Sequence, residues 1–232
     1  MPYFYGFDYT YLIFCLPPLL LALWAQSKVK STFARYSRVA SERGMTGRAA
    51  ARLILDANGL QNVPVSRISG ELTDHFDPRE NIIRLSDPVY DVPTAAAVGV
   101  AAHEAGHAVQ YAVGYAPMKL RSALVPVTNI GSRLSMPLIL LGILMSFEPL
   151  AYFGVILFAA TAVFQLVALP VELDASRRAL AALEGSGMSA EGLDGAKKVL
   201  SAAALTYVAA LLTAVGNLLR LLMMVRRNDN RR

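Results

Sequence analysis

Residues 101–110 read AAHEAGHAVQ and place two of the chain's three histidines beside a glutamate. The surrounding stretch, from about residue 94 to 111, is rich in alanine and free of proline, which favours a helix. On a helix His103 and His107 lie on one face, one turn apart, so that both imidazoles can reach one tetrahedral Zn²⁺. Glu104 is rotated by about 100° from His103 and can reach a water held by that ion.

An accidental H-E-x-x-H on an amphipathic helix is the alternative interpretation. Burying three such ionisable groups without partners costs several kcal/mol, and the neighbouring Ala, Gly and Val offer none. The stretch therefore predicts a helix that carries a metal site and a general base. Ala105 and Gly106 are small enough to let another element approach this site closely.

The composition around this helix is typical of a membrane protein. Hydrophobic residues make up 55% of the 232 residues and charged residues only 17%. Residues 9–25 carry no charge and are long enough to cross about 30 Å of hydrocarbon, with a kink expected at Pro17 and Pro18. No Lys or Arg precedes this run, so segment 8–26 is predicted to be an uncleaved anchor instead of a signal peptide.

Further apolar segments predict a transmembrane hairpin over residues 124–171, turning at SFEP. Asn129 and Arg133 would lie at membrane depth and face a bundle interior, and Pro170 is expected to end the third span. A fourth apolar stretch, 200–225, ends in a basic tail at 226–232. Its length and composition predict a fourth transmembrane helix, but a full crossing would violate the positive-inside rule. A segment that re-enters or lies along the surface is the alternative that this rule favours, and the sequence leaves both open.

Residues 27–120 form the more polar segment that contains the metal-site helix. A helix is expected after Thr46 and up to Asn58-Gly59, and VPVSRI (63–68) and ENIIRLS (80–86) are expected to be strands with a turn-rich connection. Six basic residues follow the first span, which places this segment in the cytoplasm by the positive-inside rule. The single cysteine, Cys15, excludes an intramolecular disulfide.

A catalytic zinc ion needs a third protein ligand, and few side chains can supply it. His75 is the only other histidine, and Glu172 and Asp174 follow the third span at the start of a predicted cytoplasmic helical segment, 172–199. If the first and third spans end on the same side, Glu172 and the HEAGH helix share one face of the membrane. An acid in the first turn of a helix is the simpler interpretation of Glu172.

Four blocks of the sequence resemble the YugP-type family of bacterial membrane zinc metallopeptidases: HEAGHAVQ (103–110), YAPMKLRSALVPVTNIGS (115–132), LPVELDASRRAL (169–180) and AKKVLSAAALTYVAALL (196–212). That family is similar to HtpX and the CAAX prenyl proteases, gluzincins with a downstream glutamate ligand in an E-x-x-x-D stretch. The resemblance implies that His103, His107 and Glu172 bind the metal and that Glu104 is the general base.

The resemblance also has a departure and two structural implications. Ser176 stands where those relatives have the aspartate, and Asp174 would point to a different side of a helix, so the partner of the zinc ligands is open. DPRENIIRLS (77–86) would be the edge strand over the metal, where a peptide adds as a further strand. His75 would then lie near the cleft entrance as the candidate transition-state donor.

The sequence thus predicts a mainly α integral membrane protein with three to four transmembrane helices and a small α+β gluzincin-like HEXXH domain. It would hold one Zn²⁺ per chain and cut membrane or membrane-proximal polypeptides at the cytoplasmic face of the cell membrane. Nucleic acid is not an expected partner, because the basic residues flank apolar segments instead of forming a stripe. The alternatives are a non-hydrolytic metal-binding scaffold, which would not need Glu104, and a transporter, which would spread ionisable residues through its spans.

Overall fold

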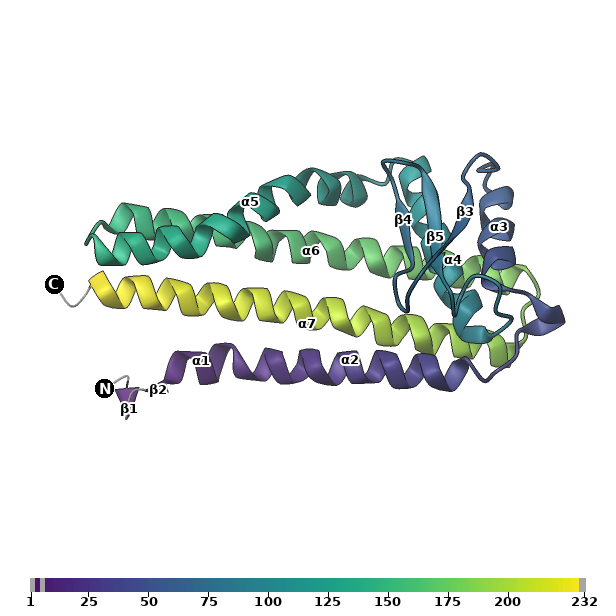
Figure 1. Cartoon of the computed structure of the whole chain (residues 1–232), viewed down its shortest axis with the longest axis horizontal. Coiled ribbons are helices and arrows are strands. Elements are labelled where there is room, and N and C mark those ends of the chain that lie inside the picture. Colours follow the sequence, from purple (N-terminus) through teal and green to yellow (C-terminus); the bar gives the residue numbers. More distant parts are fainter. Residues whose placement is uncertain (1–2, 5–6, 230–232) are drawn as a thin grey trace. The chain divides into compact units, whose positions relative to one another are not determined.

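Long helices make up most of the chain, and a small sheet accompanies them (Figure 1). The structure is a computed structural model that describes residues 3–4 and 7–229. Its helices are α1 (Tyr9–Phe14), α2 (Leu16–Tyr36), the 3-10 turn η1 (Glu42–Gly44), α3 (Gly47–Ala57), α4 (Ala95–Ala112), α5 (Ala116–Leu144), α6 (Glu148–Gly185) and α7 (Ala190–Asp229). Its strands are β1 (Tyr3–Phe4), β2 (Phe7–Asp8), β3 (Val65–Ile68), β4 (His75–Asp77) and β5 (Ile82–Ser86).

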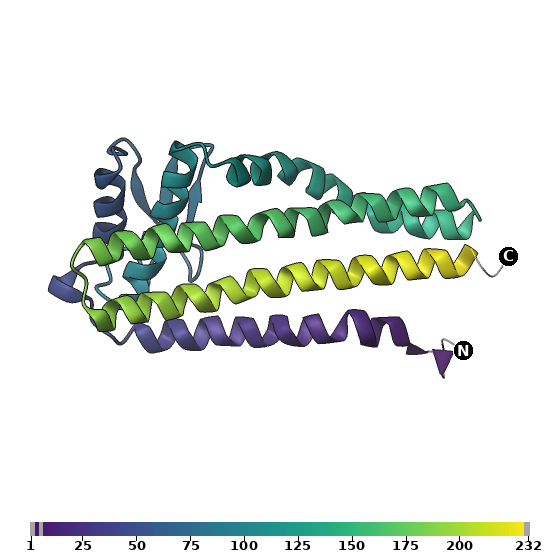
Figure 2. The ribbon, with the colours of Figure 1, turned by 180° about the vertical axis from the view of Figure 1, so that it is seen from behind.

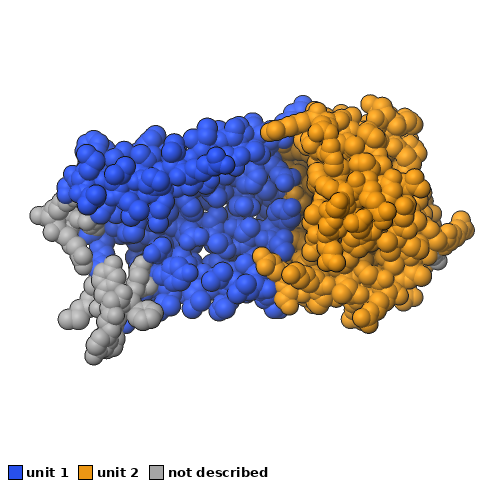
Figure 3. Space-filling view, viewed as in Figure 1, with its two compact units in different colours: residues 1–25, 119–169, 206–232 blue, residues 26–118, 170–205 orange. Residues whose placement is uncertain are grey.

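The chain divides into two compact units, coloured separately in Figure 3. Unit 1 comprises Met1–Ala25, Lys119–Leu169 and Thr206–Arg232, and unit 2 comprises Gln26–Met118 and Pro170–Leu205. Both units are therefore assembled from segments far apart in the sequence. The HEAGH helix and the segment that begins at Pro170 belong to the same unit, unit 2.

Four helical segments in the described part of the chain are long and apolar enough to cross a membrane: Tyr9–Tyr36, Ala116–Leu144, Glu148–Gly185 and Ala190–Arg227. The prediction of a mainly helical chain with three to four helices able to span a membrane is thereby confirmed. The interruption expected near Pro17 and Pro18 lies at Cys15, between α1 and α2. Both prolines fall in the first turn of α2, where a missing N–H removes no intrahelical hydrogen bond.

Small residues set the helix packing within unit 1. A Cβ atom on Gly216 of α7 would overlap the carbonyl oxygen of Phe14, and one on Gly142 of α5 would overlap the backbone nitrogen of Ala151 in α6. Such close backbone approach is typical of membrane helices, where packing rather than water exclusion drives association. A hydrogen bond from the Cys15 thiol to Asn217 Oδ1, at 3.3 Å, also joins the N-terminal helices to α7.

The fourth apolar stretch is part of one continuous helix, which is long and apolar enough to cross a membrane. Helix α7 runs unbroken from Ala190 to Asp229, and within unit 1 it lies beside α6 and the N-terminal helices in both views (Figures 1 and 2). Leu221 and Val225 pack in a cluster with residues of α5 and α6, Ile139, Ala151 and Val155. The positive-inside rule concerns the arginines of the tail, whereas this packing concerns the apolar length of the helix. The helix that forms is determined by apolar packing along its length.

Unit 2 is built around a three-stranded sheet in the order β3-β5-β4. Strand β3 pairs parallel with β5, from Val65 opposite Ile83 to Ile68 opposite Ser86, and β4 pairs antiparallel with β5, with Phe76 opposite Ile83. The sequence-based assignment of 77–86 as the edge strand is therefore wrong. Strand β5 has the buried residues Ile83 and Leu85 and lies in the centre, whereas the edge strand is β4, which the sequence analysis assigned to a turn-rich connection.

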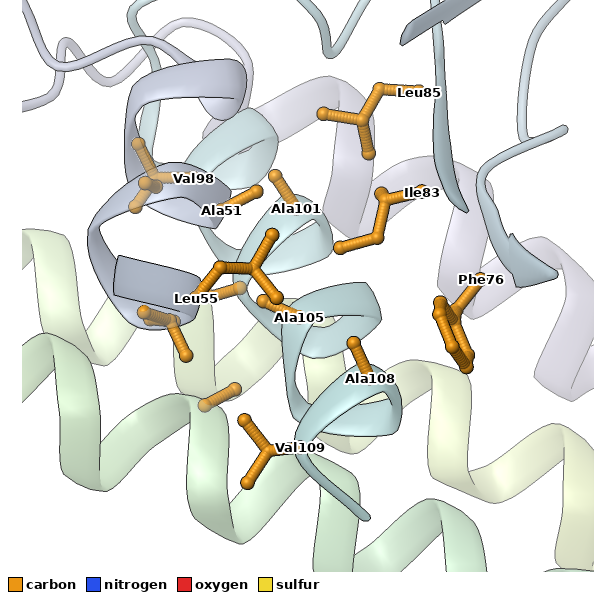
Figure 4. Packing of buried hydrophobic residues seen from close by; sticks show 14 of the residues in the cluster. Ala51, Leu55, Phe76, Ile83, Leu85, Val98, Ala101, Ala105, Ala108 and Val109 are labelled. Carbon is orange, nitrogen blue, oxygen red and sulfur yellow. The ribbon is translucent and has the colours of Figure 1, made fainter. Parts of the chain in front are cut away.

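Helix α4 passes through the core of this unit. Figure 4 shows Ala101, Ala105 and Ala108 of α4 between Leu55 of α3 and the side chains of the sheet, including Ile83. Alanine on the buried faces lets neighbouring elements pack closely against the helix. The expected caps are confirmed: the Thr46 side chain accepts a hydrogen bond from Ala49 N–H at the start of α3, at 3.2 Å, and Gly59 has φ +72° just after its end.

Pro170 does not end a helix as predicted. Helix α6 continues through this residue from Glu148 to Gly185. A proline removes one backbone hydrogen bond from a helix interior, but buried side chains flank it on both sides at Ala168, Val171 and Glu172. This packing holds the helix in register and carries it into unit 2 without a new start.

Candidate metal centre

The two histidines of the HEAGH motif lie together on α4 as the period of a helix requires. Their ring centroids are 4.6 Å apart and the rings are nearly perpendicular, at 80°. His107 is buried, and His103 keeps 13% of its side chain exposed. The pair therefore forms one wall of a site that is open mainly on the His103 side.

Helix α6 brings the third group to this wall. A Cβ atom on Gly106 would lie 2.6 Å from the carbonyl oxygen of Ala175, so α4 and α6 approach at a distance that only glycine allows. Three residues before Ala175, Glu172 is directed between the histidines and keeps only 3% of its surface exposed. Gly106, inside the motif, thus allows α6 to approach α4 closely, as the sequence suggested.

Three potential ligand atoms converge in unit 2. One atom each of His103, His107 and Glu172 lie within 4.8 Å of one another. Glu172 Oε2 is 3.2 Å from His103 Nε2 and 3.4 Å from His107 Nε2. Atoms about 2.0–2.1 Å from a tetrahedral Zn²⁺ are separated from each other by about 3.3 Å. The two distances from Glu172 are close to this value, so the two imidazoles and the carboxylate could hold a metal ion.

The outer nitrogen of each imidazole also has a partner. His107 Nδ1 lies 3.0 Å from Gln110 Oε1, and His103 Nδ1 lies 3.1 Å from Ser176 Oγ. In both rings this leaves Nε2 as the atom directed at Glu172. Such contacts orient metal-binding histidines, and a partner that can only accept also selects the tautomer with a lone pair on the coordinating nitrogen.

Glu104 lies beside these three groups without being one of them. It is 8% exposed, and its Oε2 accepts a hydrogen bond from the backbone N–H of Phe76, at 2.9 Å. Because Phe76 belongs to the edge strand β4, the carboxylate is fixed between the metal-site helix and the outer side of the sheet. A carboxylate in this position can exchange a proton with a group held at the centre.

The carboxylates also change the acidity of His107. Burial by itself lowers the pKa of this imidazole, but the hydrogen bond to Glu172 and the negative charges of Glu104 and Glu172 outweigh it. The net result is a pKa above the usual value for histidine. The carboxylates therefore stabilise the protonated form of His107 relative to an imidazole that is buried without them.

The other two candidates from the sequence lie outside the ligand group. His75 begins β4, its Nδ1 is 2.7 Å from the Thr73 carbonyl oxygen, and its side chain alternates with that of Phe76, which packs on the core that contains α4. The structure therefore does not bring His75 to the three ligands. Asp174 contacts Gln110 instead, with Oδ2 2.9 Å from Gln110 Nε2.

Sequence reasoning missed Gln110 and the backbone N–H of Phe76. The position of Gln110, three residues after His107 on the same helix, is a signal that places it on the histidine face. No sequence signal identifies the Phe76 N–H, because a backbone contact depends only on where β4 lies. Ser176 was singled out as a departure from the E-x-x-x-D pattern, and its hydroxyl lies beside His103 Nδ1.

Comparisons with known proteins found two matches that cover most of the chain. The sequence model of a family described as "Putative neutral zinc metallopeptidase" matches residues 11–226. The chain is 45% identical over 214 residues to the "Putative membrane protease YugP" of Bacillus subtilis (strain 168), covering 92% of this chain and 95% of that protein. No solved structure matches the chain.

Proposed function

Because this chain belongs to the family described as "Putative neutral zinc metallopeptidase", we propose that it is a membrane-embedded zinc endopeptidase. His103, His107 and Glu172 would hold one Zn²⁺ per chain, and Glu104 would be the general base. The observation that carries this proposal is the position of Glu104, which is buried beside the three ligand groups and is held by Phe76 instead of joining them.

The residues of this chain have distinct tasks in the proposed hydrolysis. A Zn²⁺ held by His103, His107 and Glu172 would supply Lewis acidity toward a peptide carbonyl and a water, whose pKa such an ion lowers to about 7. Glu104 takes a proton from the attacking water and returns it to the nitrogen of the departing amine. The Phe76 N–H orients the carboxylate of Glu104, and the burial of the site limits competing water.

The outer side of β4 is the proposed binding surface for the substrate backbone. The Phe76 N–H points away from β5, because it donates to Glu104, and the carbonyl group of a strand residue lies on the same side as its N–H. An extended peptide can therefore add beside β4 and donate an N–H to the Phe76 carbonyl. This places the peptide next to Glu104, which explains why a general base is attached to an edge strand.

A gluzincin-like arrangement is the interpretation that fits unit 2 best. Two histidines of one helix and a glutamate of a second helix supply the ligands, with Ser176 in place of the aspartate. Unit 2 carries most of the basic residues outside the apolar helices, so we assign it to the cytoplasm. Polypeptides in or near the membrane are then the expected substrates.

A direct test compares the full-length protein with Glu104→Gln after purification in detergent. Zinc content is measured by mass spectrometry, and cleavage of β-casein is followed by gel electrophoresis. We expect Glu104→Gln to keep one zinc per chain and to lose at least about 100-fold in cleavage rate, within the range for general base catalysis. Glu191→Gln, which changes an exposed glutamate of α7, is the matched control and should cleave like wild type.

The same measurements separate hydrolysis from the alternative, a metal-binding scaffold. A wild-type protein that holds zinc but cleaves neither β-casein nor denatured membrane protein at any rate above Glu104→Gln would support the scaffold. Unchanged cleavage in Glu104→Gln would refute the general-base assignment.

A further inference from the structure

Gln110 is a fully buried polar side chain whose amide is engaged at both ends. Its Nε2 donates to the carbonyl oxygen of Val171, at 2.8 Å, and to Asp174 Oδ2, at 2.9 Å. Both partners can only accept, so the NH₂ group must face them. The amide oxygen is thereby turned toward His107 Nδ1, 3.0 Å away, where it can only accept.

This hydrogen-bond network allows only one tautomer of a neutral His107. Nδ1 must carry a hydrogen to donate to Gln110, so that in the neutral ring the Nε2 lone pair faces Glu172. We propose that Gln110 and Asp174 are positioning residues of the metal centre, which together fix the tautomer and the ring orientation of His107. The inference deepens the proposed function, because it concerns metal binding at His103, His107 and Glu172.

Asp174 is in turn held from its outer side. Arg178 Nε lies 2.6 Å and Arg177 Nη1 3.6 Å from the carboxylate, and the Arg178 guanidinium lies over the ring of Tyr115, 5.8 Å from its centre. The negative charge of Asp174 is therefore separated from His107 by the side chain of Gln110 and lies next to two arginines. At Nδ1, His107 contacts the neutral amide of Gln110, which supports the orientation of the ring without adding a further charge on that side.

Ser176 gives His103 a weaker kind of support. A hydroxyl can donate or accept, so the contact at 3.1 Å to His103 Nδ1 does not select a tautomer. The tautomer of His107 is therefore fixed by Gln110, whereas Ser176 leaves both tautomers of His103 possible. A carboxylate at residue 176 could only accept when ionised, and it would lock His103 in the same way as Gln110 locks His107.

The first experiment measures the zinc affinity of the full-length protein by competition with a chromophoric chelator. We expect Gln110→Leu to weaken zinc binding by about 10- to 100-fold, the effect usual for the outer partners of metal ligands. Asp174→Ala should weaken it less, because Val171 still holds the amide. Asp194→Ala is the matched control, since Asp194 forms an ion pair of the same spacing and length with Lys198, at 2.6 Å, on α7.

The double variant Gln110→Leu/Asp174→Ala distinguishes positioning from general destabilisation. If Asp174 acts through Gln110, the double variant binds zinc no more weakly than Gln110→Leu alone. The visible absorption bands of bound Co²⁺ should change in Gln110→Leu and stay as in wild type in Asp194→Ala. Losses that add in the double variant, or equal losses in the Asp194→Ala control, would overturn the inference.

A gain of affinity provides the second test. Ser176→Asp should tighten zinc binding by about 10- to 100-fold, whereas Ser176→Ala should weaken it. A purely structural role for residue 176 predicts no tightening, so an unchanged or weaker affinity in Ser176→Asp contradicts the proposal. Failure of the wild-type protein to bind zinc at all would instead refute the proposed function.

Discussion

Replacing Gly106 by alanine tests whether the distance between α4 and α6 controls the metal centre. The added Cβ would lie 2.6 Å from the Ala175 carbonyl oxygen and 3.2 Å from its carbonyl carbon. Both neighbours are backbone atoms, which cannot rotate away as a side chain can. The two helices must therefore separate locally to accommodate a single methyl group.

The required shift is large compared with the tolerance of a metal site. Ordinary carbon–oxygen contact begins at about 3.3–3.6 Å. The distance of 2.6 Å between the added Cβ and the Ala175 carbonyl oxygen must therefore increase by about 0.8 Å. Metal–ligand distances tolerate about 0.2 Å. Glu172, one turn from Ala175, would move away from His103 and His107. Overpacking of this kind costs about 1–3 kcal/mol, and if zinc binding must restore the original spacing, that cost corresponds to about 5- to 150-fold in affinity.

Gly99→Ala is the matched control for this prediction. Gly99 also lies within α4, and its Cβ would be 3.1 Å from Ala196 of α7, away from the ligands. Both substitutions gain the same helix propensity of about 0.5–1 kcal/mol, so a difference between them reports the local contact. We expect chelator competition to show weaker zinc binding only in Gly106→Ala. Equal zinc affinity in both variants and wild type would refute the argument.

Three further predictions concern the ligands and the membrane topology. Glu172→Ala should fall below one zinc per chain while His75→Ala keeps it, as measured by mass spectrometry; the reverse result would reassign the third ligand. Removing zinc with 1,10-phenanthroline should lower the thermal unfolding temperature of wild type but not of Glu172→Ala, because only a bound ion stabilises the fold. In a Cys15→Ser background, cysteines at Arg43 and Ser186 should react with an impermeant thiol reagent only after cell lysis, and labelling of intact cells would place unit 2 outside.

The parts of the site that lie on one helix could be predicted from the sequence. The positions of His103, Glu104 and His107 follow from the helical period, and the structure preserves this relation because α4 is regular throughout. The membrane helices were predictable for a similar reason, since their length and apolar composition are local properties. Strand β4 was not, because His75–Asp77 is three residues long and has one buried side chain.

Contacts between segments far apart in the sequence could not be predicted from local patterns. Pro170 looked like a helix end because a proline lacks an N–H, yet packing on both sides keeps α6 continuous. Glu172 was selected through family resemblance, and its distance to the histidines depends on this continuity. A new helix starting after Pro170 could have directed the same carboxylate elsewhere.

The partners of the two histidines depend on one further quantity, the register of α4 against α6. That register is set where Gly106 meets Ala175. In this register Ser176, the residue after Ala175, reaches His103, and Gln110, four residues after Gly106, reaches the Val171 carbonyl and Asp174. A shift of one residue along α6 would turn the Ser176 and Asp174 side chains by about 100° relative to α4 and break their contacts with His103 and Gln110. The small residue inside H-E-x-x-H therefore determines which side chains support the ligands, although it contacts no metal itself.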